Sequence, residues 1–385
     1  MTPAGLLLEE EIRRDGPVPF RRFMEVALYH PEHGYYRRPQ DPFGKQGDFF
    51  TAEQIQPVFG LLMAARIRQL YQAMGEPSEF VVVELGAGRR EMAEAFSEWP
   101  YIPIDLDSGE LPQEISGVVF SNEFFDALPV DVAVYRDGAF REQRVALARG
   151  RFVWETGPAV SAEIEDYLRR YFPPPEEGRW YEANPDALRW MEKVVRALQY
   201  GYMLTIDYGY TRAESVRFPA GTLMGYRRHT AREDVLEDPG ERDITAHVNF
   251  SALEESGNAH GLRTERFETL AQTLLAAGEP DQFASVLTPA GDLRRRMQLK
   301  TLLFGMGETF RVLIQRRGAG TRACRAETRL GAVADRPESS EPGQLNPTLP
   351  SEREGQANSV DMSVDAAGTS ARATGERIRE PEGKA

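Results

Sequence analysis

Apolar residues along the chain repeat with two different periods, and the change of period marks the expected helices and strands. Between residues 55 and 71 they recur every three or four positions, which predicts an amphipathic helix that ends near Gly75. The next apolar run, 80–86, is hydrophobic on both faces, as is typical of a central strand in a parallel sheet. The same reasoning predicts helices at 91–99 and 184–201 and strands at 101–105, 117–124, 202–210 and 308–317.

Residues 131–156 follow the strand period instead and predict a small antiparallel meander. Its turns are expected at Asp137-Gly138 and Arg149-Gly150, where glycine tolerates the backbone of a tight hairpin. The alternation of strands and helices elsewhere favours a doubly wound α/β sheet. The predicted fold is therefore one α/β domain over residues 1–317, with an insert at about 131–180.

The end of the chain has a different composition. After Phe310 there is no aromatic residue, and from Gly318 onward the sequence is rich in small, charged and proline residues. Such a segment buries too little apolar surface to offset the entropy of ordering it. Residues 318–385 are therefore predicted to be a disordered tail.

Charge and cysteine content exclude several classes of protein. A net charge of -14 argues against a general nucleic-acid binder, although an acidic surface attracts a cationic protein substrate. The single cysteine, Cys324, cannot form an internal disulfide or a cysteine metal cluster. The first residues do not resemble a signal peptide, and no window is apolar enough for a membrane span. These features predict a cytoplasmic protein.

The strand at 80–86 leads into a glycine-rich loop whose spacing is informative. A dinucleotide-binding loop would have its third glycine at position 91, where Glu91 stands, so a nicotinamide cofactor is disfavoured. The pattern E-x-G-x-G-x-G of S-adenosyl-L-methionine (SAM) sites is matched by Glu84, Gly86 and Gly88 but is broken by Arg90. The loop alone leaves a SAM site and a structural turn equally open.

Polar residues follow two buried strands at the edge where ligands bind in such sheets. Asn122, Glu123 and Asp126 stand among aromatic residues at the end of the strand 117–124. Asp207 follows another strand, but an acid in that place is more often a turn residue. His247 and the other histidines have no metal-ligand spacing, and no metal is predicted.

Together these segments resemble the MidA-type SAM-dependent methyltransferases, whose mitochondrial members are protein arginine methyltransferases that assist complex I assembly. The resemblance covers about residues 1–317 and implies a class I methyltransferase fold, a Rossmann-like doubly wound sheet. The matching segments are 16–36, GDFFTAEQIQPVFG (47–60), ELGAGR (84–89), NEFFDALPV (122–130), IDYGY (206–210), GTLMGYRRH (221–229), DITAHVNF (243–250) and GMGETFRVLIQ (305–315).

The resemblance also implies roles for particular residues. The glycine loop would lie beneath SAM, the segment GDFFT would fold over it, and NEFFD would carry the active-site polar groups. The implied cofactor-binding residues are Gly47, Asp48, Thr51, Glu84, Gly86, Gly88 and Asn122, and the implied catalytic residues are Glu123 and Asp126.

The sequence departs from the family pattern at two places. Arg90 replaces the last glycine of the loop, and only about thirty residues separate the loop from NEFFD, where the family has a longer stretch. We interpret 101–105 as the second strand, with the outermost third strand missing. Asp105 then lies about twenty residues past the loop, where an acid binds the ribose diol. In the alternative, 101–105 is the third strand and this acid is lost.

The resulting hypothesis is a SAM-dependent methyltransferase that acts on arginine in a protein, for which the resemblance suggests a respiratory complex I subunit. An arginine acceptor is always charged, so it requires a carboxylate that binds the guanidinium and a group that takes its proton. Glu123 is the candidate for this role, with Asp126 in support. Two alternatives stay open. One is a non-catalytic or weakly active SAM-binding assembly factor, favoured by Arg90 and by the shortened cofactor half. The other is a nicotinamide oxidoreductase, disfavoured by Glu91.

Overall fold

The computed structural model describes residues 1–38, 52–227, 230–287 and 293–318, all of which belong to one compact unit of the chain. Its helices are α1 (Pro3–Asp15), α2 (Phe20–Tyr29), α3 (Val58–Ala73), α4 (Ala162–Tyr171), α5 (Pro185–Ala197), α6 (Phe250–Ala259), α7 (Leu270–Gly278) and α8 (Leu293–Thr301). The predicted tail from residue 319 on lies outside the described residues. Its disorder, and the domain boundary at residue 317, therefore stay predictions.

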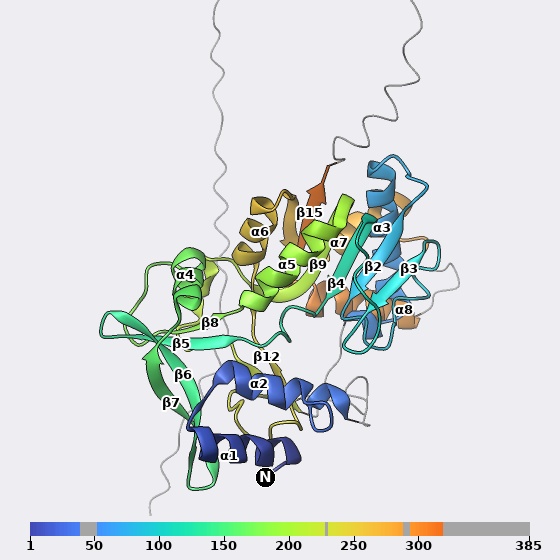
Figure 1. Ribbon diagram of the computed structural model, residues 1–385. Coiled ribbons are helices and arrows are strands. Elements are labelled where there is room, and N and C mark those ends of the chain that lie inside the picture. Colours follow the sequence, from blue (N-terminus) through green and yellow to red (C-terminus); the bar gives the residue numbers. More distant parts are fainter. Residues whose placement is uncertain (39–51, 228–229, 288–292, 319–385) are drawn as a thin grey trace, which may run out of the picture. The chain divides into compact units, whose positions relative to one another are not determined.

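A mixed sheet in the order β14-β15-β9-β4-β2-β3 forms the centre of the fold (Figure 1). Strands β3, β2, β4 and β9 are parallel, and β15 runs antiparallel to its neighbours β9 and β14. The bounds are β2 (Val81–Leu85), β3 (Tyr101–Ile104), β4 (Ile115–Asn122), β9 (Leu198–Tyr210), β14 (Arg263–Thr269) and β15 (Phe310–Arg317), with β13 (Val248–Asn249) alongside β9.

The place of β3 settles how the shortened half is built. It pairs directly with β2, in parallel, at one end of the strand order. A third strand would pair with the second strand rather than with the first. The interpretation of 101–105 as the second strand is therefore confirmed, and the alternative is wrong.

Both faces of this sheet are covered by helices. Consecutive residues of one strand point to opposite faces, so Val82 packs with the helices α3 and α7 while Val83 packs with α5 and α6. This two-sided burial explains why the strand is apolar throughout. The sheet thus has the doubly wound architecture that the sequence predicted.

The inserted meander is part of a second sheet, in the order β1-β6-β5-β8 with β7 beside β6. Both predicted turns form, because Asp137, Gly138, Arg149 and Gly150 all have positive φ angles between 50° and 77°. Helices α1 and α2 pack against this sheet. Its strands are β1 (Val18–Pro19), β5 (Asp131–Arg136), β6 (Ala139–Ala148), β7 (Arg151–Ala159) and β8 (Trp180–Ala183); a third sheet holds β10 (Met224–Arg227), β11 (Thr230–Arg232) and β12 (Asp243–Thr245).

Two helix predictions need correction. The segment 91–99 forms successive turns instead of a helix, held by hydrogen bonds that mostly span three residues, such as those from Ala93 to Arg90 and from Trp99 to Phe96. So short a segment has little helical stability of its own, and its apolar side chains are buried equally well in turns. Helix α5 ends at Ala197, four residues before Gly201, because β9 already begins at Leu198.

Candidate active site

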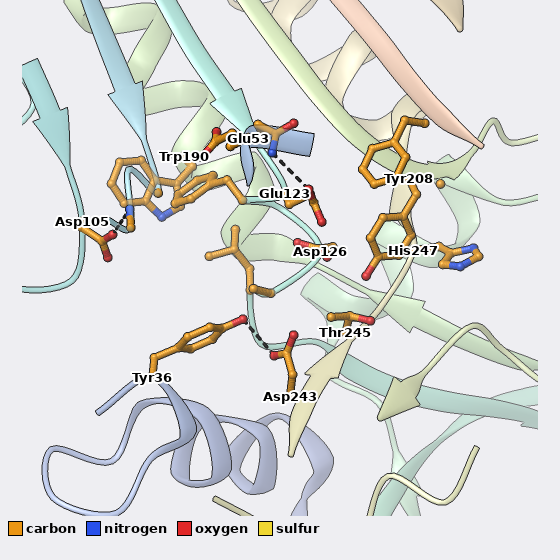
Figure 2. A pocket seen from close by; sticks show the side chains of 18 of the residues that line it. Tyr36, Glu53, Asp105, Glu123, Asp126, Trp190, Tyr208, Asp243, Thr245 and His247 are labelled. Atoms are coloured by element: carbon orange, nitrogen blue, oxygen red, sulfur yellow. Dashed lines mark hydrogen bonds between the residues drawn. The ribbon is translucent and has the colours of Figure 1, made fainter. Parts of the chain in front are cut away.

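A cavity of about 1310 Å³ lies at the carboxyl ends of β2, β3, β4 and β9 (Figure 2). Its volume exceeds the usual range for a site that holds one drug-sized ligand. One part is formed by the glycine loop and its neighbours: Gly86, Gly88, Ile104, Asp105, Leu106, Phe124 and Trp190. The other part is acidic and aromatic: Tyr36, Glu123, Asp126, Tyr208, Tyr226, Asp243, Thr245 and His247.

The glycine loop brings three predicted cofactor residues together. Gly86 and Gly88 have positive φ angles of 72° and 46°, and a β-carbon on Gly86 would lie 2.9 Å from the ring of Phe124. The backbone N–H of Gly88 donates a hydrogen bond to the carboxylate of Asp105. A glycine is therefore required at position 86 by both space and backbone conformation.

Arg90, which stands where the family pattern has its last glycine, has a left-handed backbone conformation that glycine adopts easily. Its φ angle is 59°, in the left-handed region that other residues seldom adopt. Its side chain is exposed, and it is absent from the set of described residues that line the cavity. The Arg90 side chain therefore does not occupy the space above the loop.

Glu84, the first residue of the predicted motif, is fully buried. It accepts a hydrogen bond from the hydroxyl of Tyr101 and contacts the carboxyl group of Glu53. Burial raises the pKa of Glu84 to about 7 and that of Glu53 well above its usual value. Of this pair of acids only Glu53, which the sequence reading missed, is among the described residues that line the cavity.

Glu123 and Asp126 both line the acidic part of the cavity. Glu123 has a φ angle of 52°, and its Oε1 accepts hydrogen bonds from the Ala52 N–H at 3.3 Å and from Nδ2 of Asn122 at 3.1 Å. Burial and the nearby Asp126 raise the pKa of Glu123 to about 8. Burial likewise raises the pKa of Asp126 to about 6. Within the described structure, Oδ1 of Asp126 and Oδ1 of Asn122 are buried without a hydrogen-bond partner.

The wall that faces these acids comes from β12 and from the end of the N-terminal helical region (Figure 2). Asp243 is buried, and its Oδ1 accepts a hydrogen bond of 2.8 Å from the hydroxyl of Tyr36. Thr245 lies two residues further along the same strand. Tyr208 from β9 contacts Asp126. Asp243 opens the DITAHVNF motif, so the sequence indicated this segment but not the residue.

Asp207 and His247 have more limited parts. Asp207 is fully buried and accepts hydrogen bonds from the backbone N–H groups of Phe125 and Tyr208 at 3.1 and 2.9 Å, so it fixes the loop that carries Asp126. His247 lines the cavity, and burial lowers its pKa to about 4, which keeps the ring neutral. In the described ranges no three acidic, histidine or cysteine side chains gather as metal ligands.

The raised pKa of Glu123 predicts how stability depends on pH. A carboxyl whose pKa is about 8 in the folded chain and 4.5 when unfolded stabilises the fold fully below pH 4.5. That contribution is lost as the pH rises to about 8. Between pH 6 and 8.5 the wild type should therefore lose about 2 kcal/mol of unfolding free energy relative to Glu123→Gln.

Denaturant unfolding of both proteins at the two pH values measures this difference, and titrating groups distant from Glu123 cancel in the comparison. Parallel pH profiles for wild type and Glu123→Gln would show that the carboxyl titrates normally.

Comparison with known proteins gives the class. Residues 97–268 match the family model described as "Putative S-adenosyl-L-methionine-dependent methyltransferase". A protein from Burkholderia thailandensis, crystallised with S-adenosyl-homocysteine, is 29% identical, and the match covers 82% of this chain and 92% of that one with a TM-score of 0.71. A native crystal structure from the same organism is 30% identical with the same coverage and a TM-score of 0.70.

Relatives with named activities belong to the same class of enzyme. The mitochondrial protein arginine methyltransferase NDUFAF7 homolog of Drosophila melanogaster is 27% identical over 315 residues, which are 66% of this chain and 70% of the relative. Human NDUFAF7, also named a mitochondrial protein arginine methyltransferase, is 27% identical over 318 residues, which are 66% of this chain and 68% of the human protein.

The fold, the cavity and these relatives define a class I SAM-dependent methyltransferase, and the nicotinamide alternative is set aside. The chain belongs to the family of MidA-type SAM-dependent methyltransferases, as the motifs indicated. The expected cytoplasmic location is wrong, because the curated relatives are named as mitochondrial proteins. In the described part of the chain no helix is long and apolar enough to cross a membrane.

Proposed function

We propose that this enzyme transfers a methyl group from SAM to a guanidinium nitrogen of arginine in a protein substrate. The observation that carries the proposal is the pair Glu123 and Asp126, buried at the end of the cavity that begins at the glycine loop. Buried acids so close together are costly unless a cation pairs with them. The relatives named as protein arginine methyltransferases support arginine as that cation.

Several residues fit the cofactor. Gly86 and Gly88 allow the close approach of a ligand to the backbone, and Asp105 beside them suits the ribose diol. The free Oδ1 of Asn122, for which the described residues provide no donor, supports a cofactor contact there as well. Trp190 provides an aromatic face in the same part of the cavity (Figure 2).

The remaining predicted cofactor residues are not among the described residues that line the cavity. Glu84 is buried behind the cavity, so we propose that it acts through Glu53, which does line it. Gly47, Asp48 and Thr51 lie outside the described residues, and their contact with the cofactor stays a prediction.

The proposed chemistry assigns one task to each acid. When bound, SAM supplies a methyl group whose carbon–sulfur bond breaks with its electron pair left on sulfur as the bond to nitrogen forms. The carboxylate of Glu123 orients the guanidinium and takes the proton that the nitrogen loses. Asp126 contributes the second negative charge, which favours the cation over a neutral acceptor.

Two finer parts of the proposal rest on the family resemblance. We propose residues 1–317 as the catalytic domain and a respiratory complex I subunit as the protein substrate. The position of the Arg90 side chain outside the cavity lining weakens one argument for the non-catalytic alternative, and the shortened cofactor half remains the other.

The test combines binding and transfer. Calorimetry with SAM and, separately, with NADH should show binding of SAM alone. Transfer of labelled methyl groups to peptides with one arginine should then be seen, and mass spectrometry should locate the label on that arginine. Binding of SAM without transfer to any arginine peptide or to purified complex I subunits would favour the non-catalytic assembly factor.

A further inference from the structure

The acidic part of the cavity has two walls that come from different regions of the chain. Glu123 and Asp126 follow β4, whereas Asp243 and Thr245 belong to β12 (Figure 2). The side chain of Tyr226, on β10, is close enough to Glu123, Asp126 and Asp243 for each of them to raise the pKa of its hydroxyl. The two walls therefore enclose one space.

Hydrogen bonds to backbone carbonyl oxygens fix the distance between these walls. The N–H of Ala246 donates to the carbonyl oxygen of Asp126 at 3.0 Å, which ties the DITAHVNF segment to the loop after β4. From the N-terminal region, the hydroxyl of Tyr29 donates to the carbonyl oxygen of Ala127 at 2.6 Å. A substrate group between the walls thus meets a preformed space with carboxylates on both sides.

The wall that carries Asp243 presents an oriented carboxylate to the cavity. Tyr36 donates to its Oδ1 and so fixes the plane of the carboxylate, although 207 positions separate the two residues in the sequence. Beside it, Oγ1 of Thr245 is buried next to the hydroxyl of Tyr208. On the opposite wall, Oδ1 of Asp126 is buried and unpaired in the same part of the structure. A buried carboxylate oxygen without a partner can be satisfied by a bound ligand or by an ordered water.

The two natural cationic side chains differ in what they offer to such a space. A guanidinium is planar and carries N–H groups on three nitrogens, so it can bind carboxylates on two edges at once. A lysine ammonium is a point charge with all its N–H groups on one nitrogen. It cannot donate to both walls in the same way.

We propose that Asp243, oriented by Tyr36, is a specificity-determining residue that restricts the acceptor to arginine by binding the edge of the guanidinium that faces away from Glu123. The inference rests on the proposed function and names the second anchor of the same substrate group. Glu123 lies at the nitrogen that reacts, and Asp243 holds the nitrogens that do not.

The test uses Asp243→Asn, which keeps the shape and removes the charge, together with Tyr36→Phe. With a single-arginine peptide, Asp243→Asn should raise KM about tenfold or more, the effect of a lost charged hydrogen bond, while kcat falls much less. The preference for that peptide over its lysine counterpart should fall by a similar factor. Tyr36→Phe should change both quantities in the same direction by a few-fold.

A matched control is Asp131→Asn, which neutralises a half-buried acid of the meander outside the cavity and should leave the preference unchanged. Calorimetry with SAM shows whether each variant is folded and binds the cofactor. An Asp243→Asn protein that binds SAM normally and keeps the wild-type preference for arginine would overturn the inference but leave the proposed function intact.

Peptide binding to the S-adenosyl-homocysteine complex separates this result from a failure of the proposed function. If wild type binds and methylates neither peptide, the proposed function fails, and the inference fails with it. If wild type binds the arginine peptide more tightly than the lysine peptide and Asp243→Asn binds both equally, the inference holds.

Discussion

Glu123→Gln is expected to slow methyl transfer to arginine by about 100-fold or more while SAM affinity stays nearly unchanged. The amide keeps the shape of the side chain and can still accept hydrogen bonds from Ala52 and Asn122. It cannot carry the charge that orients a guanidinium or accept the proton that the nitrogen releases. The cofactor contacts proposed at Gly86, Gly88 and Asp105 are not altered. Single-turnover rates with saturating SAM measure the effect on chemistry.

The matched control is Glu182→Gln. Glu182 is also a buried glutamate, and it accepts a hydrogen bond of 2.7 Å from the N–H of Thr222 away from the cavity. Its change should leave the transfer rate within a few-fold of wild type. If Glu123→Gln transferred methyl groups as fast as wild type, the proton-accepting role would pass to Asp126. Asp207 is a weaker candidate, because backbone N–H groups occupy its carboxylate.

The sequence predicted best those features that local physics determines. The strand that holds Val82 and Val83 was recognisable because both of its faces are buried, and the hairpin at Asp137-Gly138 because its turn requires positive φ angles. The helix predicted at 91–99 does not form. The spacing of its apolar residues suits a helix, but successive turns bury the same side chains.

The candidate site was only half predictable for a related reason. Asn122, Glu123 and Asp126 share one short motif at the end of one strand, so their proximity follows from the sequence. Asp243 and Tyr36 come from distant parts of the chain, and only the packing of α2 and β12 brings them together. Trp190 lies on a helical face whose spacing indicates core packing, and nothing in that spacing indicates the cavity.

Arg90 shows that a residue other than glycine can stand at the last glycine position of the motif with a left-handed backbone. Its φ angle is 59°, in the region that glycine adopts most easily. A non-glycine residue in this region costs on the order of 1 kcal/mol. Because the side chain is exposed, the cost falls on stability and not on the space for a ligand.

Gly88→Val is expected to lower SAM affinity by at least about 100-fold, since overpacking a fitted site costs a few kcal/mol. Gly88 lines the cavity, and its N–H contacts the carboxylate proposed to bind the ribose. A valine there would fill the space where we propose that the cofactor approaches the backbone. With a φ angle of 46° it also strains the loop and moves that N–H. Calorimetry with SAM and with S-adenosyl-homocysteine measures the loss.

Gly138→Val separates strain from loss of the site. Gly138 has a φ angle of 77° in the hairpin between β5 and β6, and a β-carbon there would meet no described atom within 4 Å. Both variants should lose similar stability in thermal unfolding, because both place a β-branched residue in the left-handed region. Only Gly88→Val should lose its affinity for SAM. Normal SAM affinity in a folded Gly88→Val protein would mean that the cofactor binds away from the glycine loop, and the roles proposed for Gly86 and Asp105 would then fall as well.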